Sequence, residues 1–407
     1  MPTQRWMDAL RAAVRAELPA AASFRHDLHR HPELSGSEAA TAERVRRALA
    51  PVTGYQVAGT GLLARIGRQD GPAVAVRAEL DALPVTETTG VPWSASGPRM
   101  HACGHDVHLA ALTALGRAMS RVGTEVPVAM LAVFQPREEA DPSGALDVMS
   151  APEWKRHEVR AVIGAHVQPL LRPGVVAATP GPINAAVCNI GITVTGSGGH
   201  AAYPHVTQDP VLAISEIVLS LQQVVSRRIS PVHAAVLSIG ELRAGSAPGV
   251  IPPSAYASGT LRALDPADMV TLRDAAAEVT HAVARAHRCE ASVSFEVGEP
   301  VLVNDERLAA DTRELLTRFG VSLAPELRSC GADDFSYYAQ AHPGLMMFVG
   351  TTNIGTKAAG QAGAVSLHQP TFCPADDAIA DVAEALLAGF ASGTRLGLTL
   401  AVRDRLG

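Results

Sequence analysis

The chain has 407 residues, of which 47% are hydrophobic and 18% are charged, and its formal net charge is −6. This length predicts two domains, and the acidic balance argues against nucleic acid as a partner. The five cysteines are scattered and odd in number. Such usage is typical of a reducing compartment rather than of a disulfide-stapled secreted domain, so we expect a cytoplasmic protein.

The N-terminal region predicts helices between residues 5 and 50. Trp6, Leu10, Val14 and Leu18 form an apolar stripe at helical spacing, and the charges spread through this segment do not fit a signal peptide. The longest apolar run, VPVAMLAVF, is too short to cross a bilayer. We therefore expect no membrane partner.

Short apolar runs then alternate with helical segments. Strand-like runs begin near residues 61, 73, 126 and 161, and a helix is predicted over 105–121. This alternation predicts an α/β domain with a mostly parallel sheet covered by helices. Functional residues gather at the carboxyl ends of such strands. Here the runs end in AELD, QPREE and GAHVQP, and each ending carries a carboxylate or a histidine.

The pattern changes near residue 185. A strand, a helix at about 208–227, two strands, a helix at about 266–287 and a last strand follow one another. This βαββαβ order predicts a ferredoxin-like α+β module. Because a strand-like GLMMFVG and a final helix resume the earlier pattern, we expect the module, residues 185–296, to be inserted into a discontinuous domain formed by residues 1–184 and 297–407.

Three histidines and a cysteine lie within eight positions, in HACGHDVH at the entrance of the 105–121 helix. Taken singly, Cys103 fits a small buried hydrophobe, His105 fits an ordinary helix N-terminal residue, and His108 fits a polar residue on an exposed helix face. A helix needs none of the three in order to fold. Their accumulation therefore favours a chemical role.

Further candidates stand at the ends of other segments. Glu138 and Glu139 fit either solvated surface charges or a functional pair, while His166 ends an apolar strand and His368 precedes a Gln-Pro turn. Together with Cys103, such imidazoles and a carboxylate suit Zn²⁺, Mn²⁺, Co²⁺ or Ni²⁺. Neighbouring side chains on an extended segment point in opposite directions. One glutamate could then bind metal while the other accepts a proton from a metal-activated water.

Six separated motifs resemble, in the same order, the metallo-amidohydrolases that include aminoacylase and glutamate carboxypeptidase: HACGHDVHLAALTALG, FQPREEA, GAHVQP, GSGGHAAYPH, GADDFSYY and LHQP. The closest branch is that of hippurate hydrolase and the indole-acetyl-amino-acid hydrolases, and the similarity spans residues 27–372. It implies a zinc-peptidase-like catalytic domain with an inserted lid and dimerisation domain. It also implies hydrolysis of N-acyl amino acids, with acetyl, benzoyl or similar acyl groups, to a carboxylic acid and a free amino acid.

The resemblance also implies roles for individual residues. Glu138 matches the general base, and Asp81 matches the carboxylate that orients the site. His200 matches a lid histidine that reaches the active site of a partner subunit and steadies the oxyanion, which implies a homodimer or a higher homo-oligomer. Arg262 matches an arginine that grips a substrate carboxylate. The ligands of two divalent ions, Mn²⁺ or Zn²⁺ before Co²⁺ or Ni²⁺, match Cys103, His105, Glu139, His166 and His368.

The chain departs from this branch at three places. Glu79 stands where Asp is usual, residues 140–149 (ADPSGALDVM) stand where a glycine run is usual, and Gly249 stands where Asn is usual. These changes lie around the expected metal ligands and among the residues expected to line the substrate pocket. A dipeptidase or carboxypeptidase of the same family, or a catalytically weak metal-binding relative, is the alternative function.

Two other interpretations explain less of the sequence. A cysteine-nucleophile hydrolase would use Cys103, but it would leave Glu139, His166 and His368 without a role. GTGLLA at residues 59–64 fits a dinucleotide fingerprint formally, but it lacks the required strand-turn-helix setting.

Overall fold

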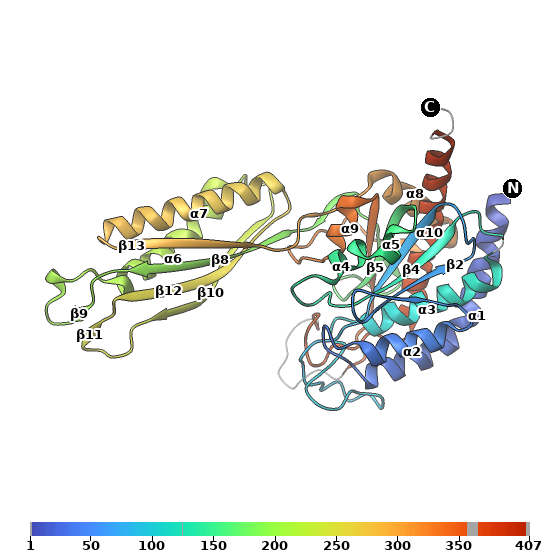
Figure 1. Cartoon of the computed structure of the whole chain (residues 1–407), viewed down its shortest axis with the longest axis horizontal. Helices are drawn as coiled ribbons and strands as arrows, with labels where there is room; N and C mark the ends of the chain where they lie inside the picture. Colours follow the sequence, from blue (N-terminus) through green and yellow to red (C-terminus); the bar gives the residue numbers. More distant parts are fainter. Residues whose placement is uncertain (1, 124, 356–364, 404–407) are drawn as a thin grey trace. The chain divides into compact units, whose positions relative to one another are not determined.

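A computed structural model describes residues 2–123, 125–355 and 365–403 and divides into two compact units (Figure 1). The first unit comprises Met1–Gly181, Val303–Leu327 and Tyr337–Gly407, and the second comprises Pro182–Leu302 and Arg328–Ser336. Each unit has its own cluster of buried apolar side chains. The return of residues 328–336 to the second unit is a feature that no pattern in the sequence indicated.

The first unit contains helices and strands from both ends of the chain. In chain order these are α1 (Pro2–Arg30), α2 (Ala39–Leu49), β1 (Tyr55–Val57), β2 (Gly61–Ile66), β3 (Ala73–Glu79), α3 (His105–Val122), β4 (Ala129–Gln135), α4 (Gly144–Ser150), α5 (Pro152–Lys155), β5 (Val159–Gln168), β6 (Val175–Ala177), α8 (Glu306–Phe319), β15 (Ser322–Leu323), β16 (Gly344–Gly350) and α10 (Asp377–Arg403). Three elements lie at the boundary between the units: β7 (Gly181–Asn184), β14 (Leu302–Asn304) and α9 (Phe335–Ala341).

The main sheet of the first unit has the order β1-β2-β4-β3-β5-β16-β6-β15. Its centre, from β4 to β16, is parallel, whereas β2 joins β4 and β6 joins β16 in antiparallel register. Every residue of β3, β4 and β16 is buried, which is why these segments read as continuous apolar runs rather than as alternating ones. The predicted mostly parallel α/β sheet is confirmed.

Helices pack on this sheet through their apolar stripes. The helices α3 and α10 contact β3 and β5, and α1 packs on α3 (Figure 1). The predicted N-terminal stripe forms the buried face of α1, where Trp6, Leu10 and Val14 are each at most 3% exposed. Burying apolar side chains of this size stabilises the fold by roughly 1.5–3 kcal/mol each. The entrance of α3 is thereby held against the carboxyl ends of the central strands.

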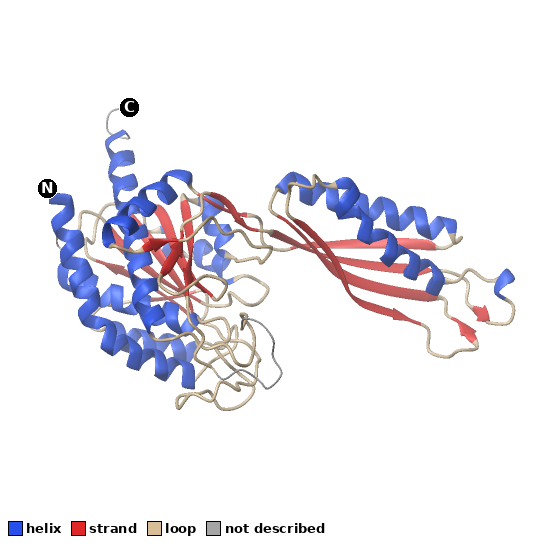
Figure 2. Cartoon of the chain, turned by 180° about the vertical axis from the view of Figure 1, so that it is seen from behind, coloured by secondary structure: helices blue, strands red, loops and turns tan. Residues whose placement is uncertain are grey.

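The second unit forms an antiparallel sheet with the order β10-β12-β8-β13. Its elements are β8 (Ala186–Thr195), β9 (Gly199–His200), a short 3-10 helix (Pro204–Val206), α6 (Pro210–Arg228), β10 (Ala235–Ala244), β11 (Val250–Ile251), β12 (Ser254–Ala263), α7 (Pro266–Ala286) and β13 (Glu290–Val297). The two long helices cover one face of this sheet (Figure 2). This is the predicted ferredoxin-like βαββαβ arrangement.

Two helix starts of the second unit show how the sequence specifies it. Asp209 and Asp265 precede α6 and α7, and each carboxylate accepts a backbone N–H two residues further on. A proline follows each cap, which suits the first helical position.

None of the described helices combines the length and the apolar character that crossing a bilayer requires.

Candidate metal centre

The candidate ligands of the first unit come from widely separated parts of the chain. Cys103 and His105 lie at the entrance of α3, Glu139 follows β4, His166 lies near the carboxyl end of β5, and His368 lies in the segment before α10. The parallel strands β3, β4 and β5 end at the same edge of the sheet. That edge is where open α/β sheets bind ligands.

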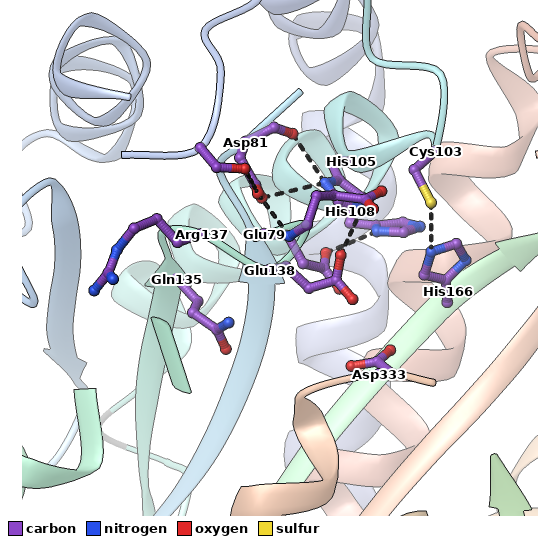
Figure 3. Close-up of polar contacts among 12 residues, drawn as sticks. Glu79, Asp81, Cys103, His105, His108, Gln135, Arg137, Glu138, His166 and Asp333 are labelled. Atoms are coloured by element: carbon purple, nitrogen blue, oxygen red, sulfur yellow. Dashed lines mark hydrogen bonds and ion pairs between the residues drawn. The ribbon is translucent and has the colours of Figure 1, made fainter. Parts of the chain in front are cut away.

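Cys103 lies at the middle of this group. Its Sγ is 3.3 Å from Nε2 of His166 (Figure 3). The same Sγ is 3.3 Å from Nε2 of His368. Nε2 of His368 is also 3.2 Å from Oε1 of Glu139, and Nε2 of His105 is 4.0 Å from the same oxygen. The fold thus brings together all five residues that the sequence singled out as metal ligands.

Hydrogen bonds orient two of the imidazole rings so that Nε2 is left for another partner. Nδ1 of His105 donates to the carbonyl oxygen of Asp81 at 2.9 Å, and Nδ1 of His166 donates to the carbonyl oxygen of Val167 at 2.7 Å. A neutral ring that donates from Nδ1 has a lone pair on Nε2. Among the described residues, Nε2 of His105 is buried and has no hydrogen-bond partner. These donors fit a divalent cation.

The electrostatics of His105 also favour a cation. Burial by itself would lower its pKa, but the hydrogen bond to Asp81 and the charge of Glu79 outweigh burial and raise the pKa of His105 to about 10. The carboxylates that attract a proton to this place attract a divalent ion in the same way. Metal binding would therefore displace a proton.

In contrast to His105, the side chains of Cys103 and His166 both favour their uncharged forms. Burial, with the nearby charges of Glu139 and Glu138, raises the pKa of the Cys103 thiol well above its ordinary value. A nucleophilic cysteine requires a lowered pKa, so this environment argues against Cys103 as the attacking group. Burial, with the charge of His108, lowers the pKa of His166 to about 3, which keeps its ring neutral, as a metal ligand must be.

Two unusual backbone conformations hold the candidate ligands in place. Gly104 lies between the first two candidate ligands with φ +87, and a Cβ there would lie 2.5 Å from Cγ2 of Val167. Only glycine combines this conformation with so close an approach. His368 has φ 65, and its N–H donates to the carbonyl oxygen of Ala102 at 2.9 Å. Such strain in a non-glycine residue is characteristic of functional sites.

The glutamate pair differs from the expectation that its side chains point in opposite directions. The chain turns at Arg137, which has φ 52 and whose N–H donates to Oε1 of Glu38 at 2.9 Å. As a result, Oε2 of Glu138 lies 3.8 Å and Oε1 of Glu139 lies 4.0 Å from Nε2 of His105. Their side chains are only 11% and 13% exposed, so the alternative of solvated surface charges is wrong.

Asp81 connects these parts of the site. Its Oδ2 accepts the N–H of Glu139 at 2.9 Å and the hydroxyl of Ser35 at 2.7 Å, and its carbonyl oxygen accepts Nδ1 of His105. Burial would raise the pKa of Asp81, but His105 and the N–H of Glu139 outweigh it and lower that pKa. The ionised Asp81 therefore holds the α3 entrance and the glutamate turn together, as an orienting carboxylate should.

The structure adds residues that sequence reasoning did not place in the site. His108 is buried and contacts Glu79, so the alternative of an exposed helix face is wrong. Glu38 directly precedes α2, and its buried carboxylate accepts the N–H groups of Gly36 and Arg137. A glutamate at a helix start looks ordinary in sequence. Only its burial marks it as a support of the glutamate turn.

The unusual segment 140–149 forms a capped helix instead of a glycine run. Ser143 precedes α4 and accepts the N–H of Ala145, which is the usual task of an N-terminal serine cap. Gly144 cannot be replaced without moving the chain, because a Cβ there would lie 1.7 Å from the carbonyl oxygen of Pro136. The segment therefore packs tightly beside the strand end that leads to the glutamate pair.

His200 and Arg262 belong to the second unit. His200 lies in β9, paired with Val250 of β11, and its exposed ring accepts the N–H of Ala202 at Nδ1, at 3.0 Å. A neutral His200 therefore carries its proton on Nε2, where it can donate. Arg262 lies in β12 and donates from Nη1 to the carbonyl oxygen of Cys330 at 3.1 Å. Cys330 belongs to residues 328–336, the segment that returns to the second unit.

Known protein families and proteins are similar to this chain. Residues 75–388 match peptidase family M20/M25/M40. The chain is 34% identical to N-acetyl-L-cysteine deacetylase of Bacillus subtilis over 81% of this chain and 79% of the relative. It is 32% identical to N-acetyldiaminopimelate deacetylase of Anoxybacillus flavithermus over 90% of this chain and 95% of the relative.

A solved structure extends the comparison to the fold. A dinuclear metal-binding peptidase of the M20 family from Bacillus subtilis has a TM-score of 0.79 and 30% identity, and the match covers 93% of this chain and 98% of that one. The resemblance predicted from six sequence motifs is thereby confirmed. The chain belongs to peptidase family M20/M25/M40.

Proposed function

We propose that this metal-dependent hydrolase cleaves the amide bond of N-acyl amino acids and holds two divalent metal ions per subunit. The observation that carries the proposal is the convergence of three Nε2 nitrogens, a thiol and a carboxylate at one edge of the sheet. The proposed ligands are Cys103, His105, Glu139, His166 and His368. Mn²⁺ and Zn²⁺ suit this ligand set best, and Co²⁺ or Ni²⁺ would also fit.

The metal ions, when bound, would supply Lewis acidity that polarises the amide carbonyl and makes water a better nucleophile. Glu138 acts as the general base. Its Oε2 lies within 3.8 Å of a proposed ligand nitrogen, close enough to take a proton from the attacking water and to pass it to the leaving amine. Asp81 keeps the ring of His105 and the backbone of Glu139 in place throughout.

His200 and Arg262 are proposed to act on the substrate from two different subunits. Arg262 pairs with Val187 near one end of the β8–β12 ladder, whereas the ribbon that carries His200 extends from the other end, where Ser254 pairs with Thr195 (Figure 1). The eight steps from Ser254 to Arg262 correspond to roughly 26 Å of extended strand.

An N-acyl amino acid is shorter than this distance. His200 and Arg262 of one chain therefore cannot both touch the same substrate molecule. If both contribute to catalysis, one of them must serve the active site of a second copy. We assign that role to His200, as the family resemblance implies, with Nε2 donating to the oxyanion. This geometry supports a homodimer, or a higher homo-oligomer, formed through the second unit.

The substrate class follows from Arg262 and from the named relatives. A guanidinium that binds a substrate carboxylate selects an amide whose amine side carries a free carboxyl group. Relatives named as deacetylases of N-acetylcysteine and N-acetyldiaminopimelate make an acetyl group the first choice for the acyl side. We place the reaction in the cytoplasm, in keeping with the five free cysteines.

A substrate panel tests the proposal. Protein loaded separately with Mn²⁺ and Zn²⁺ is offered N-acetyl, N-benzoyl and N-acyl-glutamine substrates, dipeptides, and the amides of the same compounds without the carboxyl group. We expect hydrolysis of N-acyl amino acids and its loss when the carboxyl group is blocked. Preferred cleavage of dipeptides would favour the dipeptidase alternative, and cleavage of uncharged amides alone would contradict the role of Arg262. Metal binding without any hydrolysis would favour the catalytically weak relative.

A further inference from the structure

A buried polar chain lies behind the candidate metal ligands in the first unit, and the proposed mechanism does not use it. Arg77, Glu79 and His108 are each 1% exposed. Arg77 pairs with Glu79 and donates from Nε to Oε1 of Gln135 at 3.0 Å. Burying charged groups costs free energy unless they are paired and hydrogen-bonded. Because this buried charged chain lies beside the proposed metal site, we looked for a function in its hydrogen bonds.

His108 links this chain to the strand that carries a ligand. Its Nδ1 lies 2.8 Å from Oε2 of Glu79 (Figure 3). Its Nε2 accepts the N–H of Val167 at 3.0 Å. A backbone N–H can only donate, so Nε2 carries no proton. His108 is therefore the neutral tautomer that donates from Nδ1 to Glu79.

The same bonds exclude His108 as a metal ligand. Glu79, His105 and His108 have atoms close enough together to hold an ion. However, both ring nitrogens of His108 already have partners, whereas Nε2 of His105 has none among the described residues. His108 consequently supports the site from behind.

The residue that His108 holds is itself the anchor of a ligand. Val167 directly follows His166, and its carbonyl oxygen accepts Nδ1 of the His166 ring at 2.7 Å. The N–H of Val167 points to His108 and its carbonyl oxygen points to His166, so Val167 connects the two rings. Any movement of Val167 would displace Nε2 of His166, which now lies 3.3 Å from Sγ of Cys103.

We propose that His108 is a positioning residue: by accepting the Val167 N–H, with its tautomer held by Glu79 and Arg77, it sets the geometry and the metal affinity of His166. This inference rests on the metal site of the proposed function. Burial would raise the pKa of Glu79, but Arg77 and His108 outweigh it and hold that pKa well below its ordinary value. Glu79 is therefore a carboxylate that can accept from Nδ1 of His108.

Three substitutions of His108 separate hydrogen bonding from packing. In His108→Gln the amide oxygen can replace Nε2 as acceptor of the Val167 N–H. In His108→Asn the shorter amide can replace only Nδ1, and His108→Leu keeps much of the volume but accepts no hydrogen bond. Each variant is prepared without metal and titrated with Co²⁺ in competition with a chelator, and the visible absorption of the Co²⁺ form is recorded. Thermal unfolding of the metal-free proteins reports on the fold.

We expect the Co²⁺ affinity to fall about 10- to 100-fold in His108→Asn and His108→Leu, as for other partners of metal-ligating histidines. His108→Gln should remain closest to the unmodified protein, and the Co²⁺ spectrum should change in the same order. Equal affinities and unchanged spectra in all three variants would overturn the inference. So would equal losses in His108→Gln and His108→Leu that follow the thermal stability, because packing alone predicts that result.

Cys103→Ala, titrated in parallel, distinguishes this inference from the metal site on which it rests. Retention of both metal ions by Cys103→Ala would show that the proposed site itself is wrong. Loss of metal there, together with His108 variants that bind Co²⁺ normally, would refute only the positioning role.

Discussion

The two units of this protein hold their candidate functional side chains in contrasting ways. In the first unit, three of the five candidate ligands, Cys103, His105 and His166, are at most 7% exposed, and both of these imidazole rings are oriented by backbone carbonyl groups. His368 is the exception, because its side chain is 51% exposed. In the second unit, His200 is exposed on a two-stranded ribbon and Arg262 is half-buried. A metal centre requires ligands preorganised to within a fraction of an ångström, whereas exposed groups can meet a substrate or a second subunit. Substitutions in the first unit should therefore affect metal binding and the catalytic rate of the same chain, whereas substitutions in the second unit should affect contacts with the substrate or with the active site of a second subunit.

The largest effect is expected from Cys103→Ala, which removes the group at the middle of the candidate centre. The variant should lose bound metal and, with it, all measurable hydrolysis, because the remaining ligands leave one or both ions undercoordinated. Elemental analysis and the hydrolysis assay measure the two effects. Cys289→Ala is the matched control, since Cys289 is a buried cysteine in the core of the second unit and its loss should leave the metal content unchanged. Full metal occupancy in Cys103→Ala would contradict the site.

Glu138→Gln should separate chemistry from metal binding within the first unit. The amide keeps the shape of the side chain but accepts no proton, so kcat should fall by about 10²- to 10⁴-fold while the metal content stays complete. Glu139→Gln is the comparison, because it should weaken metal binding as well. Steady-state kinetics together with metal analysis decide between the two roles. A Glu138→Gln enzyme within a few-fold of the normal rate would mean that another group is the base.

Mixed oligomers test whether the second unit acts on a neighbouring subunit. His200→Ala and Glu138→Gln should each be inactive alone. A heterodimer of the two would contain one site with both Glu138 and the partner's His200, so random exchange in equal amounts should restore roughly a quarter of the normal activity. The activity is measured before and after subunit exchange. Absence of any recovery, with exchange verified by mass, would argue against catalysis across subunits.

The smallest effect concerns the stability of the first unit at alkaline pH. His29 is buried between Asp106 and Glu87, at 3.0 and 3.1 Å. Burial alone would lower its pKa, but these carboxylates outweigh burial and raise the pKa of His29 to about 9. A raised pKa stabilises the folded protein fully below the ordinary value of about 6.5, and this contribution is lost as the pH rises through about 9. It amounts to roughly 3 kcal/mol over that interval.

His29→Gln should therefore be less stable than the unmodified protein near pH 6.5, and the difference should shrink as the pH rises toward about 9 and stay constant above it. Urea unfolding of the metal-loaded proteins at several pH values measures it. A difference that is independent of pH would show that His29 is not protonated in the folded protein.

Much of this site could be predicted because its residues stand where local patterns end. The candidate ligands Cys103 and His105 lie at the start of an amphipathic helix, and the glutamate pair and His166 lie at the ends of runs that form β4 and β5. The alternation of strands and helices implied a parallel sheet, and such sheets collect functional groups at one edge. Ordered motifs then sufficed to predict the family.

Other features required the folded chain. Glu138 and Glu139 were expected to point apart, but the turn at Arg137, held by the buried Glu38, brings both carboxylates toward His105. His108 read equally well as a surface residue. Its burial against Glu79 depends on how α3 packs on β3, and no helical periodicity reports which strand a helix will meet.

The sequence by itself thus determined the elements, the candidate ligand types and their order along the chain, because helix and strand periodicities and motif spacings are local properties. Only the tertiary structure decided which nitrogen of each histidine faces the site, which carboxylates share it, and that His200 and Arg262 lie near opposite ends of one sheet. These outcomes arise from contacts between residues far apart in the chain. Packing and hydrogen bonding among buried groups select them jointly, so that no single segment contains the information.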